Sequence, residues 1–493
     1  MRLSTPPAEI LVTTAYAREI FDAPILFDGM ALADVAHVAE LIEAGIVPRD
    51  IGARLLDALL GLCDEPPADF KPDPARGDLY SNRVEYLRGA GAPVGWLSLG
   101  RARREATTIA YRIAVRDRLL GLAAALWACA RTVLDVAQAH RATLFPDYTY
   151  LQSAQPTTFG HYILTFVEPI LRDLDRLHTI YNRTNVSPAG CGSVNGSRLP
   201  LDRARLADRL GFDGVIGHTR DAMWQADGPI EILALVVMSL INLDRLAEDL
   251  QIFSTAEFGL VELSDRHART SVIMPQKKNP YSLAYVRGAC GEAIGTLTSM
   301  AAVAKTPSGQ IDNRMFAYGD VPRALDVATG AIRLMADVVA GVTIDVDAAA
   351  RRTSEQFIGA TDLAETLVVW YRSEQPVLDY STAHDIVGSA VRIAGETGAS
   401  AFTSEVLDAA AEAVIGRKLR LPSNLLASAI DPAAVVSSRT GIGGAAPHLV
   451  QAFIDERADA IDRFAVWRQH TEARLAAAKS RLLELASNLA HSA

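Results

Sequence analysis

Apolar residues recur with a helical spacing over long stretches in the middle of the chain. From Pro229 to about Phe258 they are separated by three or four positions, and charged side chains occupy much of the remaining surface. The 35 residues from Ala106 to His140 contain no proline and are rich in Ala, Leu, Arg and Ile, a composition that favours helix. A helix of that length spans roughly 50 Å at ~1.5 Å per residue, which exceeds the width of a small domain.

Three more segments show long helical patterns. They are Thr158–Asn182, where Pro169 can introduce a kink, Tyr281–Lys305 and Arg323–Val342. Strict alternation of apolar and polar residues, which marks a half-buried strand, is scarce. The pattern therefore predicts an all-α fold with a central bundle of long helices. Several of these helices carry apolar residues beyond one stripe, which favours association of bundles between subunits.

The two ends of the chain show shorter helical patterns. A proline-rich segment at Glu65–Pro74 ends the short helices of the N-terminal part. A turn-rich segment at Ser437–Gly444 precedes a final charged, amphipathic helix. We predict three helical domains, at residues 1–105, 106–350 and 351–493.

Composition narrows the class of protein. Of the 493 residues, 49% are hydrophobic and 22% are charged, which is typical of a soluble globular protein. The longest apolar stretch, Ile232–Leu243, is shorter than the ~20 residues that a membrane span requires. The start of the chain lacks the apolar core of a secretory signal. We therefore expect a cytoplasmic protein without a membrane partner.

Charge and cysteine content exclude further classes. A net charge of −10 disfavours a nucleic-acid partner, which would require a basic face. The four cysteines lie far apart without a CxxC pair, so reduced thiols are expected rather than a zinc site or a disulfide framework. His161 and His384 belong to no cluster with metal-ligand spacing, and we expect no bound metal.

One loop holds the residues with the strongest chemical signal. Pro275 and Pro280 lie five positions apart and exclude a regular helix or a central strand. The segment Ser271–Pro280 is therefore a loop between two long helices, and it contains Ser271, Lys277 and Asn279. Composition alone does not make such a loop functional, because most polar surface loops perform no chemistry.

The wording of this loop resembles a family signature. Its residues SVIMPQKKNP are similar to GSSxMPxKxNP of the fumarase/aspartase superfamily, and MPQKKNP is the form found in argininosuccinate lyases. Thr149–Pro156 resembles the THLQxAQP segment of the same family, and Gly100–Glu105 occupies the place of its GRSRND segment. We identify the chain as an argininosuccinate lyase-like member of this superfamily.

The resemblance implies a reaction and a set of roles. It implies a reversible β-elimination, without a cofactor, that cleaves the C–N bond of an N-substituted aspartate to fumarate and an amine. Ser271 falls on the catalytic base, and Lys277 and Asn279 fall on the residues that stabilise the aci-carboxylate with fixed donors. The matches to the other two family segments imply that Arg103, Thr149 and Gln152 contact the substrate.

Several positions depart from the family. Tyr150 replaces a histidine associated with proton donation to the leaving group, and we predict that Tyr150 is the donor. Tyr80 and Ser98 replace two more family histidines. Arg104 stands where argininosuccinate lyases have an asparagine that helps to hold the substrate, and we retain it as a binding residue.

The region that contacts the leaving group also differs. Pro307–Arg314 departs from the family's LAYNKDLQ segment, and Gln310, Asn313 and Arg314 offer hydrogen bonds suited to an acidic or polar leaving group. The sequence therefore predicts that the dicarboxylate half of the substrate is kept and the amine half is changed. Argininosuccinate itself, elimination of a non-amine group, and a catalytically silent homologue remain alternatives.

The resemblance also implies an assembly. Its members are homotetramers whose central helices form a common bundle, and each active site combines segments of three chains. We therefore expect the segments around Arg103, Thr149 and Ser271 to meet only in a homotetramer, where they bind a small dicarboxylate.

Overall fold

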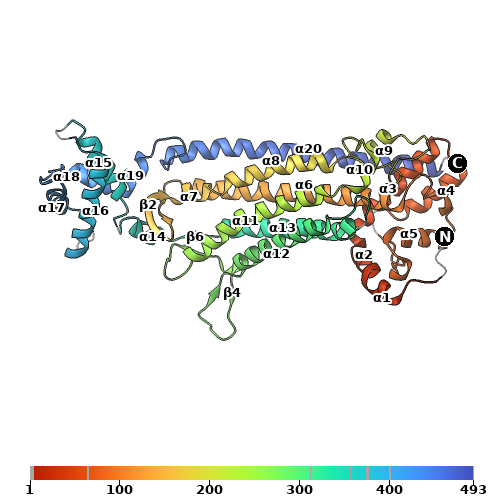
Figure 1. Ribbon diagram of the computed structural model, residues 1–493, viewed down its shortest axis with the longest axis horizontal. Coiled ribbons are helices and arrows are strands. Elements are labelled where there is room, and N and C mark those ends of the chain that lie inside the picture. Colours follow the sequence, from red (N-terminus) through yellow and green to blue (C-terminus); the bar gives the residue numbers. More distant parts are fainter. Residues whose placement is uncertain are drawn as a thin grey trace.

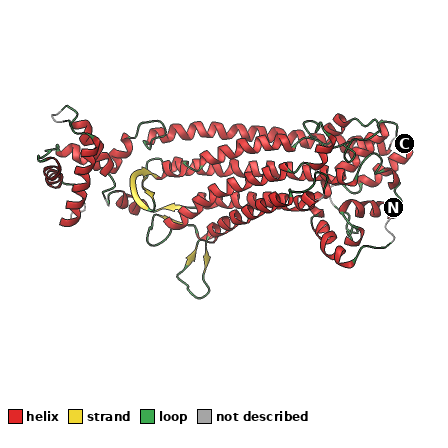
Figure 2. Cartoon of the chain, viewed as in Figure 1, coloured by secondary structure: helices red, strands yellow, loops and turns green. Residues whose placement is uncertain are grey.

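The computed structural model describes residues 5–63, 66–310, 312–355, 357–373, 377–398 and 401–491, without the side chains of residues 312 and 313. Long helices lie along one another and form an elongated body with a smaller helical unit at each end (Figures 1 and 2). The all-α class predicted from the sequence is confirmed. The helices of the bundle are α6 (Arg103–Ala139), α8 (Val167–Thr184), α11 (Asp227–Phe253), α12 (Tyr281–Val303), α13 (Asp312–Ala340) and α20 (Pro447–His491).

The central helix of the bundle is α6. It packs against α13, α3 (Ala23–Glu43), α20 and α8, while α11 packs against α12 and α13. Among the described helices, α6 is the one long and apolar enough to cross a membrane, with a mean hydropathy of 1.6 over its most apolar stretch. Because 56% of that stretch is buried inside the protein, packing in the core explains its apolar character, as it does for other core helices.

Two predicted helices have different bounds in the structure. The predicted helix Thr158–Asn182 is divided into α7 (Phe159–Leu164) and α8, and Pro169 lies in the first turn of α8. Proline is tolerated there because the first N–H groups of a helix have no partner within it. Helix α13 begins at Asp312, before the predicted start at Arg323, and Pro322 lies inside it. The prediction was wrong because packing of α13 against α6 and α12 outweighs the lost hydrogen bond.

In the part of the chain that the structure describes, three short antiparallel pairs of strands connect the helices. β1 (Leu144–Thr149) pairs with β2 (Gln152–Thr158) at the end of α6. β4 (Arg269–Thr270) pairs with β5 (Lys278–Asn279) at the base of a loop that projects from the bundle (Figure 1). β3 (Val261–Glu262) pairs with β6 (Thr343–Ile344). The sequence did not reveal these strands, because they are too short or too irregular to show an alternating pattern.

The end units differ in how they join the bundle. The N-terminal unit holds α1 (Glu9–Leu11), α2 (Ala17–Phe21), α3, α4 (Arg49–Leu60) and α5 (Leu79–Gly89), and most buried apolar residues of α3, α4 and α5 belong to the core of the bundle. A separate core lies in the unit at the opposite end, which comprises α15 (Ala360–Trp370), α16 (Tyr380–Thr397), α17 (Ser404–Ile415), α18 (Ser423–Ile430) and α19 (Pro432–Ser438).

Helix α20 leaves this end unit and returns along the bundle. It contacts α6 and reaches α4 and α3 of the N-terminal unit (Figure 1). Its buried residues Val450, Ile461 and Leu482 belong to the core of the bundle. The remaining α-helices of the described residues are α9 (Arg203–Arg209), α10 (Thr219–Trp224) and α14 (Val346–Thr353). The division into domains at residues 105 and 350 stays a prediction.

Candidate functional site

The loop between β4 and β5, residues 271–277, holds Ser271 and Lys277. Ser271 is half-buried as a residue, and its hydroxyl accepts a hydrogen bond from the backbone N–H of Met274 at 3.1 Å. A turn of the backbone, Lys277 N–H to Met274 C=O at 3.0 Å, folds the loop back toward β5. The apolar side chain of Val272 is fully exposed at the tip, with 102% relative exposure. The loop therefore presents its signature residues on a surface that the chain itself leaves uncovered.

Two adjacent lysines of this loop have different surroundings. Lys278 forms ion pairs with Asp265 at 2.7 Å and Glu262 at 3.1 Å, and Asp265, followed by Glu262, raises its pKa. Lys277 is exposed and pairs with no carboxylate among the described residues. Asn279 is held in place by its side-chain amide, which donates one hydrogen bond to the Arg269 carbonyl at 2.9 Å. Of the two lysines, Lys277 is thus the one available to a ligand.

The tip of the β1–β2 hairpin holds Thr149, Tyr150 and Gln152. Thr149 and Gln152 are paired across a two-residue turn made by Tyr150 and Leu151. All four side chains are exposed, and Tyr150 has 99% relative exposure. The predicted binding residues Thr149 and Gln152 therefore flank the predicted proton donor.

The backbone of this turn is strained. Tyr150 and Leu151 have φ angles of 53° and 57°, as a type I′ turn requires. Asn and Gly are the residues that favour this region, and a non-glycine residue there costs on the order of 1–3 kcal/mol. The structure thus holds a fully exposed tyrosine at an energetic cost, and strained exposed residues of this kind are concentrated at functional sites.

The start of α6 holds Arg103 and Arg104. Arg103 is the first residue of the helix, and its guanidinium lies 3.6 Å from the Asp78 carboxylate. The Arg104 guanidinium is largely buried and pairs with Glu19 at 3.0 Å and with Asp78 at 3.9 Å. Two positive charges at a helix N-terminus oppose the helix dipole, and the two carboxylates compensate for them. Of the two arginines, Arg103 has the more exposed guanidinium.

The residues predicted to contact the leaving group lie near the start of α13. Gln310 is exposed in the preceding turn, and its backbone N–H donates to the Pro307 carbonyl at 3.0 Å. Arg314 is buried and donates to the Thr108 hydroxyl of α6 at 3.2 Å. The side chain of Asn313 lies outside the described part of the structure. Arg314 thus faces the interior of the bundle.

The structure does not bring all of these residues together within one chain. The 37 residues of α6 separate Arg103 from the β1–β2 hairpin, a length of about 55 Å at ~1.5 Å per residue. Figure 1 shows the hairpin and the start of α6 at opposite ends of the bundle, with the β4–β5 loop projecting elsewhere. A single chain therefore contains three separate groups of predicted site residues.

Two positions at which family histidines are replaced contact each other. The Tyr80 and Ser98 hydroxyl groups lie 2.8 Å apart and form a hydrogen bond, close to the start of α6.

Comparison with known proteins establishes the family. A family model described as lyase matches residues 79–295. An argininosuccinate lyase of Methanothrix thermoacetophila is 33% identical over 431 residues, 86% of this chain and 86% of that protein. The chain belongs to the argininosuccinate lyase family. Another member of the family, from Methanoculleus marisnigri, is 33% identical over 92% of this chain and 91% of its own length.

Solved structures of other lyases share the fold. EDDS lyase in complex with formate is 28% identical, with a TM-score of 0.85 over 97% of this chain and 96% of that chain. An EDDS lyase variant with bound fumarate has a TM-score of 0.86 and 28% identity, with 99% and 97% coverage. A class II fumarase from Schistosoma mansoni shares the fold, with a TM-score of 0.70 and 13% identity. As a member of this family, the protein is a carbon–nitrogen lyase that releases fumarate.

Sequence reasoning singled out Arg314 but overlooked the buried polar residues beside it between the bundle helices. Arg112 interrupts the apolar run Ile109–Val115 of α6, and that interruption was a signal in the sequence. The structure places Arg112 beside a cavity that Tyr111 and Arg314 also line. The apolar spacing of α6 predicts a core helix, and it does not reveal what surrounds a charged position within that core.

Proposed function

We propose that this family member cleaves an N-substituted aspartate whose amine half differs from that of argininosuccinate. A base removes the proton from the carbon next to one carboxylate, and the electron pair moves into that carboxylate to form an aci-carboxylate. Its collapse creates the double bond of fumarate and breaks the C–N bond. The amine leaves with a proton from an acid, so atoms and charge balance without a cofactor.

Ser271 is the proposed base, and the geometry of its loop supports this role. A serine acts as a base only where its alkoxide is stabilised. The Met274 N–H already points at the Ser271 oxygen at 3.1 Å. Lys277, unpaired among the described residues, supplies a cation. The Asn279 amide donates one of its two hydrogens to the Arg269 carbonyl, and the other, which bonds to no described residue, is proposed to meet the developing aci-carboxylate.

Tyr150 is the proposed acid for the departing amine. Its hydroxyl faces solvent, and the strained turn fixes it between Thr149 and Gln152. Thr149 and Gln152 then contact the substrate next to the acid, while Arg103 binds a carboxylate through its exposed guanidinium. The single observation that carries the proposal is the intact set of Ser271, Lys277 and Asn279 on the β4–β5 loop and the strand β5 that follows it.

The leaving group is proposed to be polar or acidic. Arg104 replaces the family asparagine and forms an ion pair with Glu19. Gln310 is exposed, four residues before Arg314 in the sequence. These residues retain charge and hydrogen-bonding capacity, yet they differ from those that hold the arginine half in the family. Argininosuccinate lyase activity itself is the second candidate, because relatives of that name match 86–92% of this chain.

A complete site requires several copies of the chain. Arg103, the hairpin tip and the β4–β5 loop cannot converge in one chain, because α6 keeps the first two about 55 Å apart. Exposed apolar side chains on the loop, among them Val272 and Ile273, require a covering surface. We propose a homotetramer in which neighbouring copies supply the missing groups and exclude water from Ser271.

Synthesis in the reverse direction tests this function whatever the leaving group is. The purified protein is incubated with fumarate and a panel of amines, diamines and amino acids, and adducts are identified by mass spectrometry. We expect an N-substituted aspartate that disappears in Ser271→Ala and persists in the control Ser480→Ala, an exposed serine of α20. Efficient turnover of argininosuccinate would favour the second candidate, and no adduct from an intact assembly would refute a C–N lyase with altered amine specificity.

A further inference from the structure

The short helix α10 packs against α6 at the end of the bundle where α6 begins (Figure 1). Gln225, the residue that follows α10, accepts a hydrogen bond from the buried Arg112 of α6. Its side-chain amide also donates to the Asp221 carboxylate of α10 at 2.7 Å. These hydrogen bonds attach α10 to the central helix of the bundle, so α10 can serve as a fixed support for whatever it contacts.

Arg220 makes the first contact between α10 and the segment Pro307–Arg314, which is predicted to contact the leaving group. Nη2 of Arg220 donates to the Ser308 carbonyl at 2.6 Å and to the Ser308 hydroxyl at 3.2 Å. Ser308 lies two residues before Gln310, in the turn that residues 307–310 form. A hydrogen bond from a charged donor is stronger than one from a neutral donor, so Arg220 ties this turn to α10.

The turn has a shape that accepts this guanidinium. A Cβ added at Gly309 would lie 3.0 Å from Nη2 of Arg220, closer than most contacts that a Cβ makes. Glycine therefore lets the guanidinium lie directly on the turn, and a larger residue would displace it. The N–H groups of Gly309 and Gln310 both donate to the Pro307 carbonyl, at 2.7 and 3.0 Å. The hydrogen bonds of the turn and the contact with Arg220 thus act on the same four residues.

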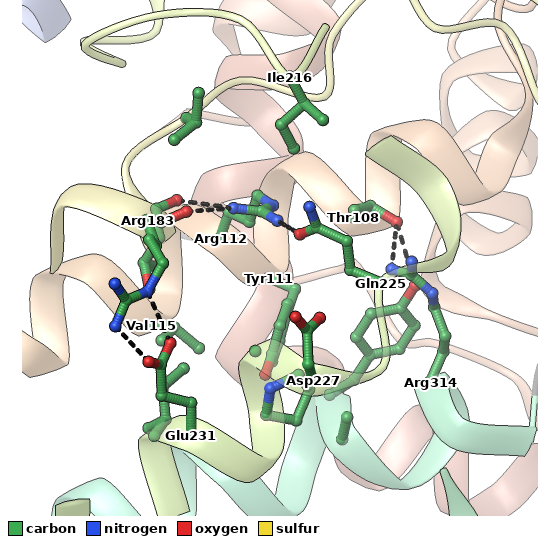
Figure 3. Close-up of a pocket in the computed structure, with 17 residues that line it drawn as sticks. Thr108, Tyr111, Arg112, Val115, Arg183, Ile216, Gln225, Asp227, Glu231 and Arg314 are labelled. Carbon is green, nitrogen blue, oxygen red and sulfur yellow. Dashed lines mark hydrogen bonds and ion pairs between the residues drawn. The ribbon is translucent and has the colours of Figure 1, made fainter. Parts of the chain in front are cut away.

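Trp224 makes the second contact, on the other side of Gln310. The Arg314 guanidinium lies 5.6 Å from the centroid of the Trp224 ring, within the range of a cation–π interaction. Arg314 also donates to the Thr108 hydroxyl of α6 at 3.2 Å, a hydrogen bond that Figure 3 shows. Helix α10 therefore contacts the chain two residues before Gln310 and four residues after it, and the direction of Gln310 depends on these contacts.

Helix α10 is also connected to the start of α6. The Thr219 hydroxyl donates to the Val194 carbonyl at 3.1 Å. In the same loop, the Gly192 carbonyl accepts a hydrogen bond at 3.1 Å from the N–H of Ala102, the residue before α6. Because the predicted carboxylate-binding arginine is the first residue of α6, α10 lies between that arginine and Gln310 and connects the two groups.

We propose that Arg220 is a positioning residue that determines specificity for the leaving amine. It acts through the turn of residues 307–310, which holds Gln310 toward the amine half of the substrate, and not on the reacting atoms. This inference rests on the proposed function, in which Gln310 contacts that half. Loss of the Arg220 guanidinium should therefore weaken binding of the amine and leave binding of fumarate unchanged.

Steady-state kinetics in the direction of synthesis test this role, because the amine and fumarate are then separate substrates. With the amine of the panel that forms the most adduct, Arg220→Ala should raise KM for the amine about fivefold, as expected for loss of one hydrogen bond. KM for fumarate should stay within about twofold, since the effect of one lost contact is local. Arg220→Lys keeps one cationic donor and should recover part of the loss. Arg392→Ala, which removes an exposed arginine of α16, is the matched control and should behave like the wild type.

A wild-type KM for the amine in Arg220→Ala, or an equal rise in KM for both substrates, would overturn the proposal. Gly309→Ala approaches the same contact from the turn. It should also raise KM for the amine, and the double variant Arg220→Ala/Gly309→Ala should be no worse than Arg220→Ala alone, because both changes remove one contact. Effects that multiply in the double variant would show that Arg220 does not act through the turn.

Crystal structures of the wild type and Arg220→Ala test the contact without any activity. We expect the turn of residues 307–310 to change position while α10 stays attached to α6. An unchanged turn would overturn the positioning role even in an active lyase. Absence of any adduct with the wild-type protein would instead refute the proposed function, and with it the role of Arg220 in specificity, whatever the position of the turn.

Discussion

The β4–β5 loop and the bundle cavity hold polar groups in opposite ways. Ser271 and Lys277 are on a loop that projects from the chain, while Arg112, Arg314 and Tyr111 are buried between helices of the same chain. Electrostatic interactions gain strength where water is excluded. Folding of one chain already buries Arg112, Arg314 and Tyr111, but the loop obtains a dry environment only when another surface covers it.

This difference indicates what each region needs in order to function. The loop residues can act on a substrate only after assembly, because α6 keeps the other predicted site residues far away. The cavity is complete in a single chain and depends on packing of α6 against α13 and of α11 against α13. Changes at the loop should therefore affect catalysis and leave stability intact, whereas changes at the cavity should affect the stability of the bundle.

The largest expected effect comes from mixing two inactive variants. Ser271→Ala should lower kcat by about 10³-fold, as expected for loss of a catalytic base. Arg103→Ala should also be nearly inactive, because a carboxylate contact is lost. Co-refolding the two should restore measurable activity, since some sites then contain both intact residues. Activity no higher than that of the separate variants would contradict a site shared between chains.

The two adjacent lysines should differ by a large factor. Lys277→Met should lower kcat/KM by about 10²–10³-fold, the usual effect of losing one donor to a developing anion. Lys278→Met should retain activity within a few-fold, because that lysine is paired with Asp265 and Glu262. Steady-state kinetics on the amine identified by mass spectrometry measures both. Equal losses of kcat/KM in the two variants would contradict a specific role for Lys277 and would show that only the total positive charge of the loop matters.

Replacement of the proposed acid should have a smaller, pH-dependent effect. Tyr150→Phe should lower kcat by about 10²-fold, at the low end for general acid catalysis, with little change in the thermal midpoint. Tyr150→His should retain more activity, with a pH profile that changes near neutrality. Profiles of kcat against pH, from acidic to alkaline conditions, distinguish the Tyr150→Phe variant from the Tyr150→His variant. Wild-type kinetics in Tyr150→Phe would exclude this residue as the donor.

The smallest effect concerns the buried first turn of α6. Burial raises the pKa of Glu105 to about 7, against the opposing charge of Arg101, and its carboxyl accepts the Gly190 N–H at 2.7 Å. The folded state thus binds a proton that the unfolded state has released, so stability should fall as pH rises from about 4.5 to 7 and then stay level.

A comparison of thermal midpoints checks whether stability falls, as predicted, when the pH rises. The midpoint of the wild type should fall between about pH 5 and about pH 7 relative to that of Glu105→Gln, in which the titrating group is absent. Glu484→Gln, on the exposed face of α20, should follow the wild type. A wild-type midpoint that rises relative to Glu105→Gln over this range would contradict a raised pKa.

Much of the fold could be predicted from the sequence because helix formation leaves a local, repeating record. The apolar spacing of Pro229–Phe258 and the composition of Ala106–His140 identified α11 and α6 to within a few residues. The start of α13 was missed, because Pro322 is locally unfavourable and only contacts with α6 and α12 compensate for it.

The family and the signature loop were also determined by the sequence, since fixed spacing of Ser271, Lys277 and Asn279 is visible without coordinates. Only the tertiary structure decided that Lys278 is engaged in ion pairs while Lys277 pairs with no described carboxylate, and that Arg314 faces an interior cavity. Sequence spacing fixes which side chains share a helix face, but their partners come from segments far away along the chain. Those partners depend on how whole helices pack, and packing is a property of the complete fold.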